Sequence, residues 1–166
     1  MEIRNLLPSD WAAVKSIYEK GITTGNATFH TSAPSWKDWD TSHLQSCRIV
    51  VEDNGILVGW AALTPVSSRC VYAGVAEVSV YVEPERSGKG IGLALLNELI
   101  TLSEADGIWT LQAGYFLKIL VAFASMKRQV SEPLVLGKRL ANRMGSGGIQ
   151  CYWKEEVTRL FNQINL

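Results

Sequence analysis

The sequence predicts an α/β fold of the mixed α+β kind, in which helices cover the faces of one sheet. Three β-patterned segments follow one another between Arg48 and Val82, and Asp53-Asn54-Gly55 joins the first two as a hairpin turn. The third segment leads through a glycine-rich turn into an amphipathic helix. Antiparallel strands followed by such a β–loop–α unit are typical of a mixed sheet. The 166 residues fit one domain, because a domain near this size buries about 68–70% of its unfolded surface.

The remaining elements follow from local patterns along the chain. A strand-like segment opens at Met1, and Pro8-Ser9-Asp10 caps a helix from Trp11 to Thr23. A second helix is expected over Ser35 to Gln45. After it we expect strands at Arg48 to Glu52, Ile56 to Thr64 and Tyr72 to Val82, a helix at Gly90 to Ala105, and a strand at Gly107 to Gln112. The buried stripe of the helix after the glycines is expected to consist of Ile91, Leu95, Leu99 and Leu102.

The charge balance narrows the classes of partner. Sixteen Lys and Arg residues match sixteen Asp and Glu residues, which leaves no electrostatic footprint for nucleic acid or for an anionic membrane surface. The longest apolar run, around Leu117 to Ala124, is too short to span a bilayer. We therefore expect a small-molecule partner, no nucleic acid and no membrane.

The cysteines and histidines suggest no metal site and no nucleophile. Cys47, Cys70 and Cys151 are scattered, with neither CxxC nor zinc-ligand spacing, so we expect reduced thiols, a cytoplasmic location and no metal. The chain opens without a secretory apolar region. His30 and His43 have no partners at catalytic spacing, and both are expected at the surface.

The glycine-rich turn is the main candidate site. It reads Gly88-Lys89-Gly90-Ile91-Gly92, which has neither the GxxxxGK[ST] spacing of a P-loop nor the GxGxxG spacing of a dinucleotide-binding turn. Free backbone N–H groups, a helix N-terminus with roughly half a positive charge and one lysine all favour a bound anion such as phosphate. A mere tight turn is the alternative.

The segment from Ser87 to Gly92 resembles the pyrophosphate loop of the GNAT N-acetyltransferases, whose pattern is Q/R-x-x-G-x-G/A. The resemblance implies the GNAT acyl-CoA N-acyltransferase fold, with acetyl-CoA as co-substrate. Ser87 departs from the pattern and Arg86 lies one place early, so the resemblance carries over the backbone cradle and not a side-chain contact with phosphate. The implied cofactor-binding residues are Gly88, Lys89, Gly90, Ile91, Gly92 and Leu93 at the pyrophosphate, and Val80, Tyr81 and Val82 along the pantetheine arm.

Residues 2–113 resemble the phosphinothricin and methionine sulfoximine acetyltransferase branch of that family. The matches are Asn26-Ala27-Thr28-Phe29, Gly59-Trp60-Ala61 and the R-x-x-Y-x-x-x-x-E pattern that ends at Glu77. The resemblance implies that Glu77 is the catalytic base in a direct transfer within a ternary complex. It also implies a pocket for an amino-acid-like amine, shaped by Phe29, Arg69 and Tyr72, and it allows a homodimer.

Each of these residues has an ordinary structural alternative. Glu77 lies in an otherwise apolar strand, where alternation places it on the side of Val75 and Ser79, and it could be a solvated strand-edge residue. Arg69 could be a solvated charge beside the half-buried ring of Tyr72. Phe29 could be a core aromatic.

The resemblance stops at about Phe116. The family continues with a Pro-Glu-Asn-type turn, a helix with a His-Glu-Lys-like run, a Gly-Phe pair and two strands, and none of these follows Phe116 here. One missing base at the Phe116 codon would regroup suitable codons into Pro-Glu-Asn-Thr and, further on, into His-Glu-Lys and Gly-Phe. The tail also lacks a steady apolar period, and Met144 to Gly148 is nearly all Gly and Ser. We therefore expect a GNAT core over 1–116 and an irregular, out-of-frame tail over 117–166, with a genuine basic tail as the alternative.

The leading hypothesis is an acetyl-CoA-dependent N-acetyltransferase that acts on the amino group of a small amino-acid-like substrate of the phosphinothricin or methionine sulfoximine type. Two alternatives stay open. One is an inactive remnant or an acyl-CoA-binding module, and the other is a peptide N-terminal acetyltransferase of the same fold. The exact amine and the activity of this chain also stay open.

Overall fold

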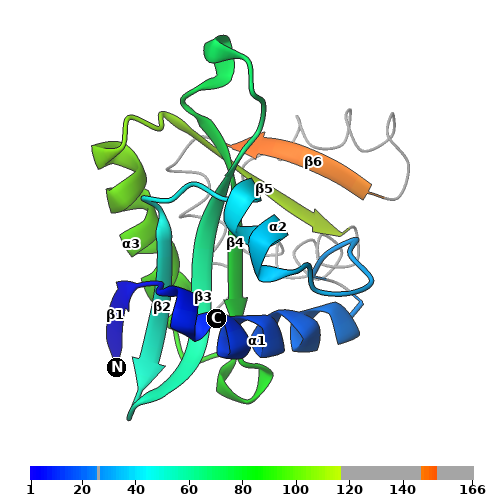
Figure 1. Cartoon of the computed structure of the whole chain (residues 1–166), viewed down its shortest axis with the longest axis vertical. Coiled ribbons are helices and arrows are strands. Elements are labelled where there is room, and N and C mark those ends of the chain that lie inside the picture. Colours follow the sequence, from blue (N-terminus) through cyan, green and yellow to red (C-terminus); the bar gives the residue numbers. More distant parts are fainter. Residues whose placement is uncertain (26, 117–146, 153–166) are drawn as a thin grey trace, which may run out of the picture.

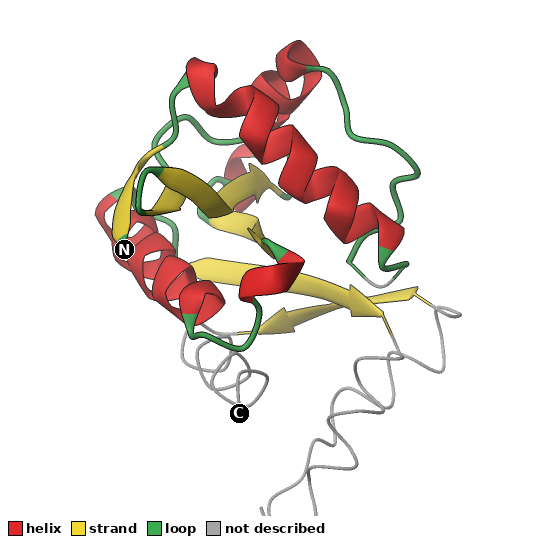
Figure 2. Ribbon diagram, turned by 90° about the horizontal axis from the view of Figure 1, so that it is seen from below, coloured by secondary structure: helices red, strands yellow, loops and turns green. Residues whose placement is uncertain are grey.

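The computed structural model describes residues 1–25, 27–116 and 147–152, which form one six-stranded sheet with helices on both of its sides (Figure 1, Figure 2). The strand order is β1-β2-β3-β4-β5-β6, and all neighbouring pairs are antiparallel except β4 and β5, which run parallel. The predicted mixed α/β class is therefore confirmed. The strands are β1 Glu2–Asn5, β2 Arg48–Asp53, β3 Ile56–Pro65, β4 Val75–Val82, β5 Thr110–Phe116 and β6 Gly147–Tyr152. The helices are α1 Trp11–Thr23, α2 Trp36–Ser42 and α3 Ile91–Ala105.

Local signals predicted the helices well. α1 has the predicted bounds, and α3 begins one residue after the expected glycine. Ile91, Leu95 and Leu99 of the predicted stripe are buried, whereas Leu102 is only partly buried and Leu96 is fully buried in its place. α2 is shorter than expected, since it ends at Ser42.

Arg48 explains why α2 stops early. Its buried guanidinium donates to the main-chain carbonyls of Asp40, His43 and Leu44, which end the helix, and it also pairs with the Asp40 carboxylate. Carbonyls at the end of a helix have no intrahelical donors, so this clamp satisfies them. The guanidinium also lies over the Trp39 ring, 5.1 Å from its centroid.

The third predicted strand begins later than expected. β4 starts at Val75 and not at Tyr72, because Cys70–Tyr72 forms a 3₁₀ turn and Gly74 lies under the Trp109 indole. A Cβ on Gly74 would lie 2.0 Å from that ring. The N–H groups of Trp109 and of the residue after it both donate to the Gly74 carbonyl, at 2.9 and 3.0 Å. These contacts hold the start of β5 against β4.

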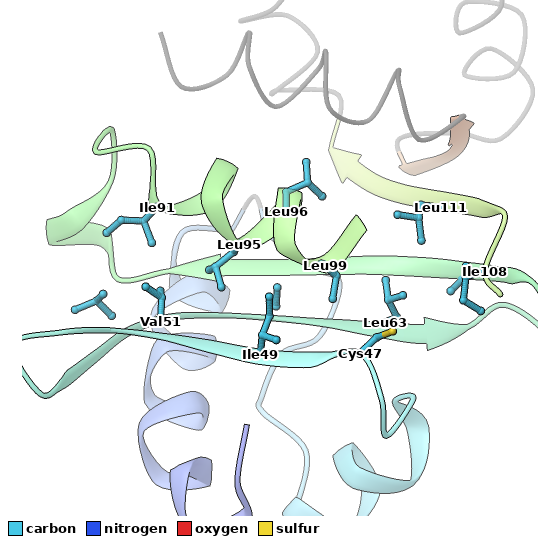
Figure 3. Packing of buried hydrophobic residues seen from close by; sticks show 13 residues of the cluster. Cys47, Ile49, Val51, Leu63, Ile91, Leu95, Leu96, Leu99, Ile108 and Leu111 are labelled. Atoms are coloured by element: carbon cyan, nitrogen blue, oxygen red, sulfur yellow. The ribbon is translucent and has the colours of Figure 1, made fainter. Parts of the chain in front are cut away.

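Two hydrophobic clusters lie on opposite faces of the sheet. The cluster under α3 contains aliphatic side chains from β2, β3 and the helix, and Figure 3 shows Leu95 and Leu99 directed towards Ile49 and Leu63. The cluster on the other face, under α1 and α2, combines the rings of Tyr18, Trp39 and Trp60 with aliphatic side chains. The period-two alternation of each strand thus separates an aliphatic layer from one that holds the buried aromatic rings.

β6 lies within the segment that was expected to be irregular. It pairs antiparallel with β5, from Leu111 opposite Tyr152 to Phe116 opposite Gly147. Gly147–Tyr152 thus has regular pairing where irregular backbone was expected, and because a backbone ladder on an open strand edge requires no particular side chains, the pairing does not test the reading frame. The rest of that expectation falls on 117–146 and 153–166, which lie outside the described residues.

His43 is not the surface residue that the sequence suggested. Its ring is partly buried, stacks on Trp39 with centroids 4.1 Å apart, and places Nδ1 2.7 Å from the Trp39 carbonyl. Burial, opposed by the hydrogen bond to the Trp39 carbonyl and assisted by the nearby Arg48 charge, lowers the pKa of His43 to about 4. The imidazole therefore packs as a neutral aromatic ring of the α2 face.

The stability of the fold should decrease as the pH falls from about 6.5 to about 4. In this window the unfolded chain protonates His43 and the folded chain does not, so the free energy of unfolding rises with pH. Urea unfolding at several pH values measures this slope. His43→Asn keeps an N–H donor for the Trp39 carbonyl and should flatten the curve between pH 4 and 6.5; a variant with the wild-type slope would contradict the assignment.

Candidate functional site

The central feature of the site is the point where β4 and β5 separate. The two strands pair only at Val75 with Thr110, Ala76 with Leu111, and Glu77 with Gln112. Beyond this point β4 pairs with β3 alone as far as Val82. β5 pairs with β6 alone as far as Phe116. Within the described residues, the edge of β4 that faces β5 therefore has no ladder partner after Glu77. Alternate N–H and C=O groups of Val78 to Val82 are available to an extended ligand, as an added strand would use them.

A cavity lies beside the far end of this open edge. Its volume is about 210 Å³, and its walls come from the end of β4, the following turn and the start of α3. The lining residues are Val80, Val82, Arg86, Ser87, Gly88, Ile91 and Gly92. Val80 and Val82 also pack against the aliphatic cluster under α3, so the cavity lies on the α3 face of the sheet.

The turn that borders the cavity is shaped for an anion. Gly88 and Gly90 both have a φ of +76°, a conformation that L side chains rarely adopt. The first intrahelical hydrogen bond of α3 runs from Ala94 to the Gly90 carbonyl, so the N–H groups of Ile91, Gly92 and Leu93 have no acceptor within the helix. No side chain among the described residues caps them. Exposed Lys89 lies in the same turn.

Arg86 is the charged side chain of the cavity wall. It follows β4 in the 3₁₀ turn Pro84–Arg86, and its guanidinium donates to Asp53 of the β2–β3 hairpin turn at 2.8 Å. The ion pair ties this turn to the hairpin. A second ion pair, Lys20 with Glu83, ties α1 to the end of β4.

Glu77 lies at the opposite end of the open edge, at the last paired position before the strands separate. It is partly buried and lies across from Thr64 of β3 and Gln112 of β5. Its side chain belongs to the α1 face, since Ala76 is buried in the α3-side cluster and alternate residues point to opposite faces. Five residues of strand, about 16 Å, separate Glu77 from Val82. The fork thus has an anion cradle at one end and a carboxylate at the other.

The other residues implied by the resemblance lie in surface segments. The Arg69 guanidinium lies 6.0 Å from the ring centroid of Tyr72, so these two contact each other. Both lie in the β3–β4 connection, which projects from the sheet (Figure 1), and Tyr72 is 42% exposed. Phe29 is 69% exposed, so its interpretation as a core aromatic is wrong.

Sequence reasoning missed a group of aromatic residues near the loop after α1. The Tyr18 hydroxyl lies 2.8 Å from His30 Nδ1, and the Tyr81 hydroxyl donates to the Ala27 carbonyl at 3.3 Å. These contacts join α1, β4 and the loop on one face of the sheet. No local spacing in the sequence predicts them. The one usable signal was Gly21 inside a predicted helix, since a Cβ there would lie 2.8 Å from the Tyr81 ring.

The described ranges contain neither a cluster of metal-ligating side chains nor a membrane-spanning helix. Among residues 1–25, 27–116 and 147–152, no three His, Cys, Asp or Glu side chains gather where they could hold a metal ion. No helix in these ranges has the length and apolar character needed to cross a membrane.

Comparisons with known proteins agree with this geometry. The family model described as the acetyltransferase (GNAT) family matches residues 11–116. The chain is 32% identical over 116 residues to phosphinothricin N-acetyltransferase of Alcaligenes faecalis, covering 64% of this chain and 56% of that enzyme. It is 31% identical over 126 residues to L-methionine sulfoximine/L-methionine sulfone acetyltransferase of Salmonella typhimurium, covering 69% and 70%. The chain thus spans little more than half the length of the Alcaligenes enzyme.

A solved structure is similar over most of its length. YncA of Salmonella typhimurium, solved with its cofactor acetyl-CoA, superposes with a TM-score of 0.65 at 25% sequence identity. The superposition covers 80% of this chain and 81% of that one.

Proposed function

Because this chain belongs to the acetyltransferase (GNAT) family, we propose that it transfers the acetyl group of acetyl-CoA to the amino group of a small amino-acid-like acceptor. The observation that carries the proposal is the fork between β4 and β5, with an anion cradle at one end and Glu77 at the other. Acetyl-CoA has the matching form, with a pyrophosphate and a reactive thioester at opposite ends of an extended arm. The named activities of the Alcaligenes and Salmonella relatives support the acceptor class.

Acetyl-CoA would lie along the open edge of β4. The backbone of Val80, Tyr81 and Val82 would hydrogen-bond to the pantetheine arm as a neighbouring strand does. The pyrophosphate would lie in the turn from Gly88 to Leu93, where free N–H groups and the α3 N-terminus favour negative charge. Exposed Lys89 adds positive charge there, whereas the charge of Arg86 in the cavity wall is paired with Asp53. In this arrangement the thioester reaches the region of Val78 and Glu77.

The proposed reaction is a direct transfer in a ternary complex. Glu77, directly or through a water, accepts a proton from the ammonium group of the acceptor. The amine nitrogen then attacks the thioester carbonyl carbon, and a backbone N–H near Val78 or Ser79 would stabilise the resulting oxyanion. The tetrahedral intermediate then collapses: the new C–N bond is kept, the C–S bond breaks, and the departing thiolate of coenzyme A takes up the proton that the attacking nitrogen loses.

The acceptor residues carried over from the resemblance remain part of the proposal. Arg69 has a guanidinium that can bind a carboxylate or phosphinate in a bidentate manner, and Tyr72 contacts it. Phe29 is exposed on the loop after α1, as a pocket wall requires. Cys47 and Cys70 form no disulfide within the described ranges, which fits the proposed cytoplasmic location. A homodimer stays a prediction from the resemblance.

We also propose that the chain is read out of frame after Phe116. The family match that ends at residue 116 supports this, because it stops where the sequence resemblance does. The pairing of β6 with β5 favours a genuine tail, although an open strand edge can pair with segments of many different sequences.

Gly90→Val should weaken acetyl-CoA binding at least tenfold, because a branched side chain would occupy the pyrophosphate position. The positive φ also strains the backbone by about 1–2 kcal/mol, so a matched control is needed. Gly55→Val provides it, since Gly55 has a φ of +78°, has no atom within 4 Å of a built Cβ, and lies in the β2–β3 turn. Calorimetric titration should give wild-type affinity for the control. Equal losses in both variants would sink the loop assignment.

Glu77→Gln should lower kcat by roughly 100-fold or more and leave acetyl-CoA affinity unchanged, as removal of a general base does. Glu52→Gln is the control, because Glu52 is also partly buried but pairs with Arg4 at the other end of the sheet. The assay uses phosphinothricin, methionine sulfoximine and short peptides as acceptors. A near-full rate for Glu77→Gln would make Glu77 structural. Acetyl-CoA binding without turnover would favour a binding module, and turnover on peptides alone would favour the peptide N-terminal alternative.

Resequencing of the gene through the Phe116 codon tests the tail. We expect one missing base, whose restoration encodes Pro-Glu-Asn-Thr in place of the residues after Tyr115. An unbroken reading frame would overturn the proposal and make the tail genuine.

A further inference from the structure

The residues Tyr18, His30 and Tyr81 form a connected group that the proposed mechanism does not use. The Tyr18 hydroxyl lies 2.8 Å from His30 Nδ1, and the Tyr81 hydroxyl donates to the Ala27 carbonyl at 3.3 Å. The two tyrosine rings meet edge to face, with centroids 4.8 Å apart and an angle of 83°. One helix and one strand therefore hold both ends of the loop segment 27–30.

The Tyr81 ring is itself fixed in place. It stacks on Trp60 with centroids 4.7 Å apart and planes within 13° of parallel. α1 passes so close that a Cβ on Gly21 would lie 2.8 Å from two carbons of the ring. Burial, followed by the neighbouring Tyr18 hydroxyl and more weakly the Glu77 carboxylate, raises the pKa of Tyr81 above its ordinary value. Tyr81 thus remains a neutral hydroxyl that can donate to the loop.

The group lies on the same face of β4 as Glu77. Along this face Glu77, Ser79 and Tyr81 lie opposite Thr64, Ala62 and Trp60 of β3. The small pair Ser79 and Ala62 thus lies between the carboxylate and the aromatic group. The cavity proposed for acetyl-CoA is on the opposite, α3 face. An acceptor that meets the thioester without displacing the cofactor would therefore approach from the α1 face, beside the loop segment 27–30.

We propose that Tyr18, His30 and Tyr81 are positioning residues for the acceptor, because they hold the loop segment 27–30 as a fixed wall of the amine subsite. This inference rests on the proposed function. Tyr81 would then serve both substrates, with its backbone on the cofactor edge and its hydroxyl on the acceptor wall. The segment includes Phe29, which is exposed and available to contact an apolar part of a small amine.

Tyr18→Phe and Tyr81→Phe in the full chain should each raise the KM for the amine roughly three- to tenfold, the loss expected from one neutral hydrogen bond. For Tyr18→Phe, the kcat and the affinity for acetyl-CoA should stay within twofold of wild type. Gly21→Ala, which removes no hydrogen-bonding group but pushes the Tyr81 ring, should act in the same direction. Losses in kcat or in acetyl-CoA affinity as large as those in KM would overturn the inference.

The two ring nitrogens of His30 can be tested separately. Asn places a polar atom where Nδ1 lies and Gln places one where Nε2 lies, so His30→Asn should retain a near-wild-type KM and His30→Gln should not. His43→Asn is the matched control, because His43 lies at the end of α2 and should leave the KM unchanged. Rescue by Gln and not by Asn would overturn the positioning role in favour of direct contact with the substrate.

A failure of the proposed function can be told apart from a failure of this inference. If the wild-type chain acetylates no amine, the proposed function fails and hydrogen exchange decides the inference. The Tyr18→Phe/Tyr81→Phe double variant should then speed amide exchange in 27–30 while α1 keeps its protection. Unchanged exchange in the loop segment would overturn it.

Discussion

The structure depends on the fact that two parallel strands pair for three residues and then separate. Burying an unpaired backbone N–H or C=O group costs about 1–3 kcal/mol, so the open edge of β4 must remain accessible to water or be matched by a ligand. The cavity and the glycine turn lie beside the far end of this edge, and Glu77 lies where the edge begins. The β4–β5 contact is reinforced at its start, where Gly74 accepts two hydrogen bonds under the Trp109 ring.

Much of the fold could be predicted from the sequence, because its signals are local. The periodicity of α1, the Asp53-Asn54-Gly55 turn and the glycines before α3 each act within a few residues, and the structure agrees with them; Asn54 and Gly55 both have the positive φ that such a turn requires. The early end of α2 could not be predicted, because it depends on Arg48 of β2, whose guanidinium donates to the carbonyls at the end of the helix. The late start of β4 depends in the same way on a contact with Trp109, thirty-five residues beyond Gly74.

The candidate site likewise has parts with a local sequence signal and parts that depend on contacts between distant residues. The cofactor turn could be located from spacing, since its function rests on backbone groups and on a helix N-terminus. The position of Glu77 beside the fork depends on the register between β4 and β5, which only the fold provides. The link from Tyr18 to His30 and from Tyr81 to Ala27 joins three elements, and no periodicity encodes it. The exposure of Phe29 likewise depends on where its loop lies.

The contact between Gly74 and Trp109 has a consequence for how this sequence can change over evolutionary time. Because the indole occupies the space of a Cβ at position 74, a larger residue there is tolerated only after position 109 has become smaller. The reverse order leaves a gap over the glycine but no clash, so it is the permitted route. Descendants of this chain should therefore vary at the two positions as a pair, with the loss of the tryptophan preceding the loss of the glycine.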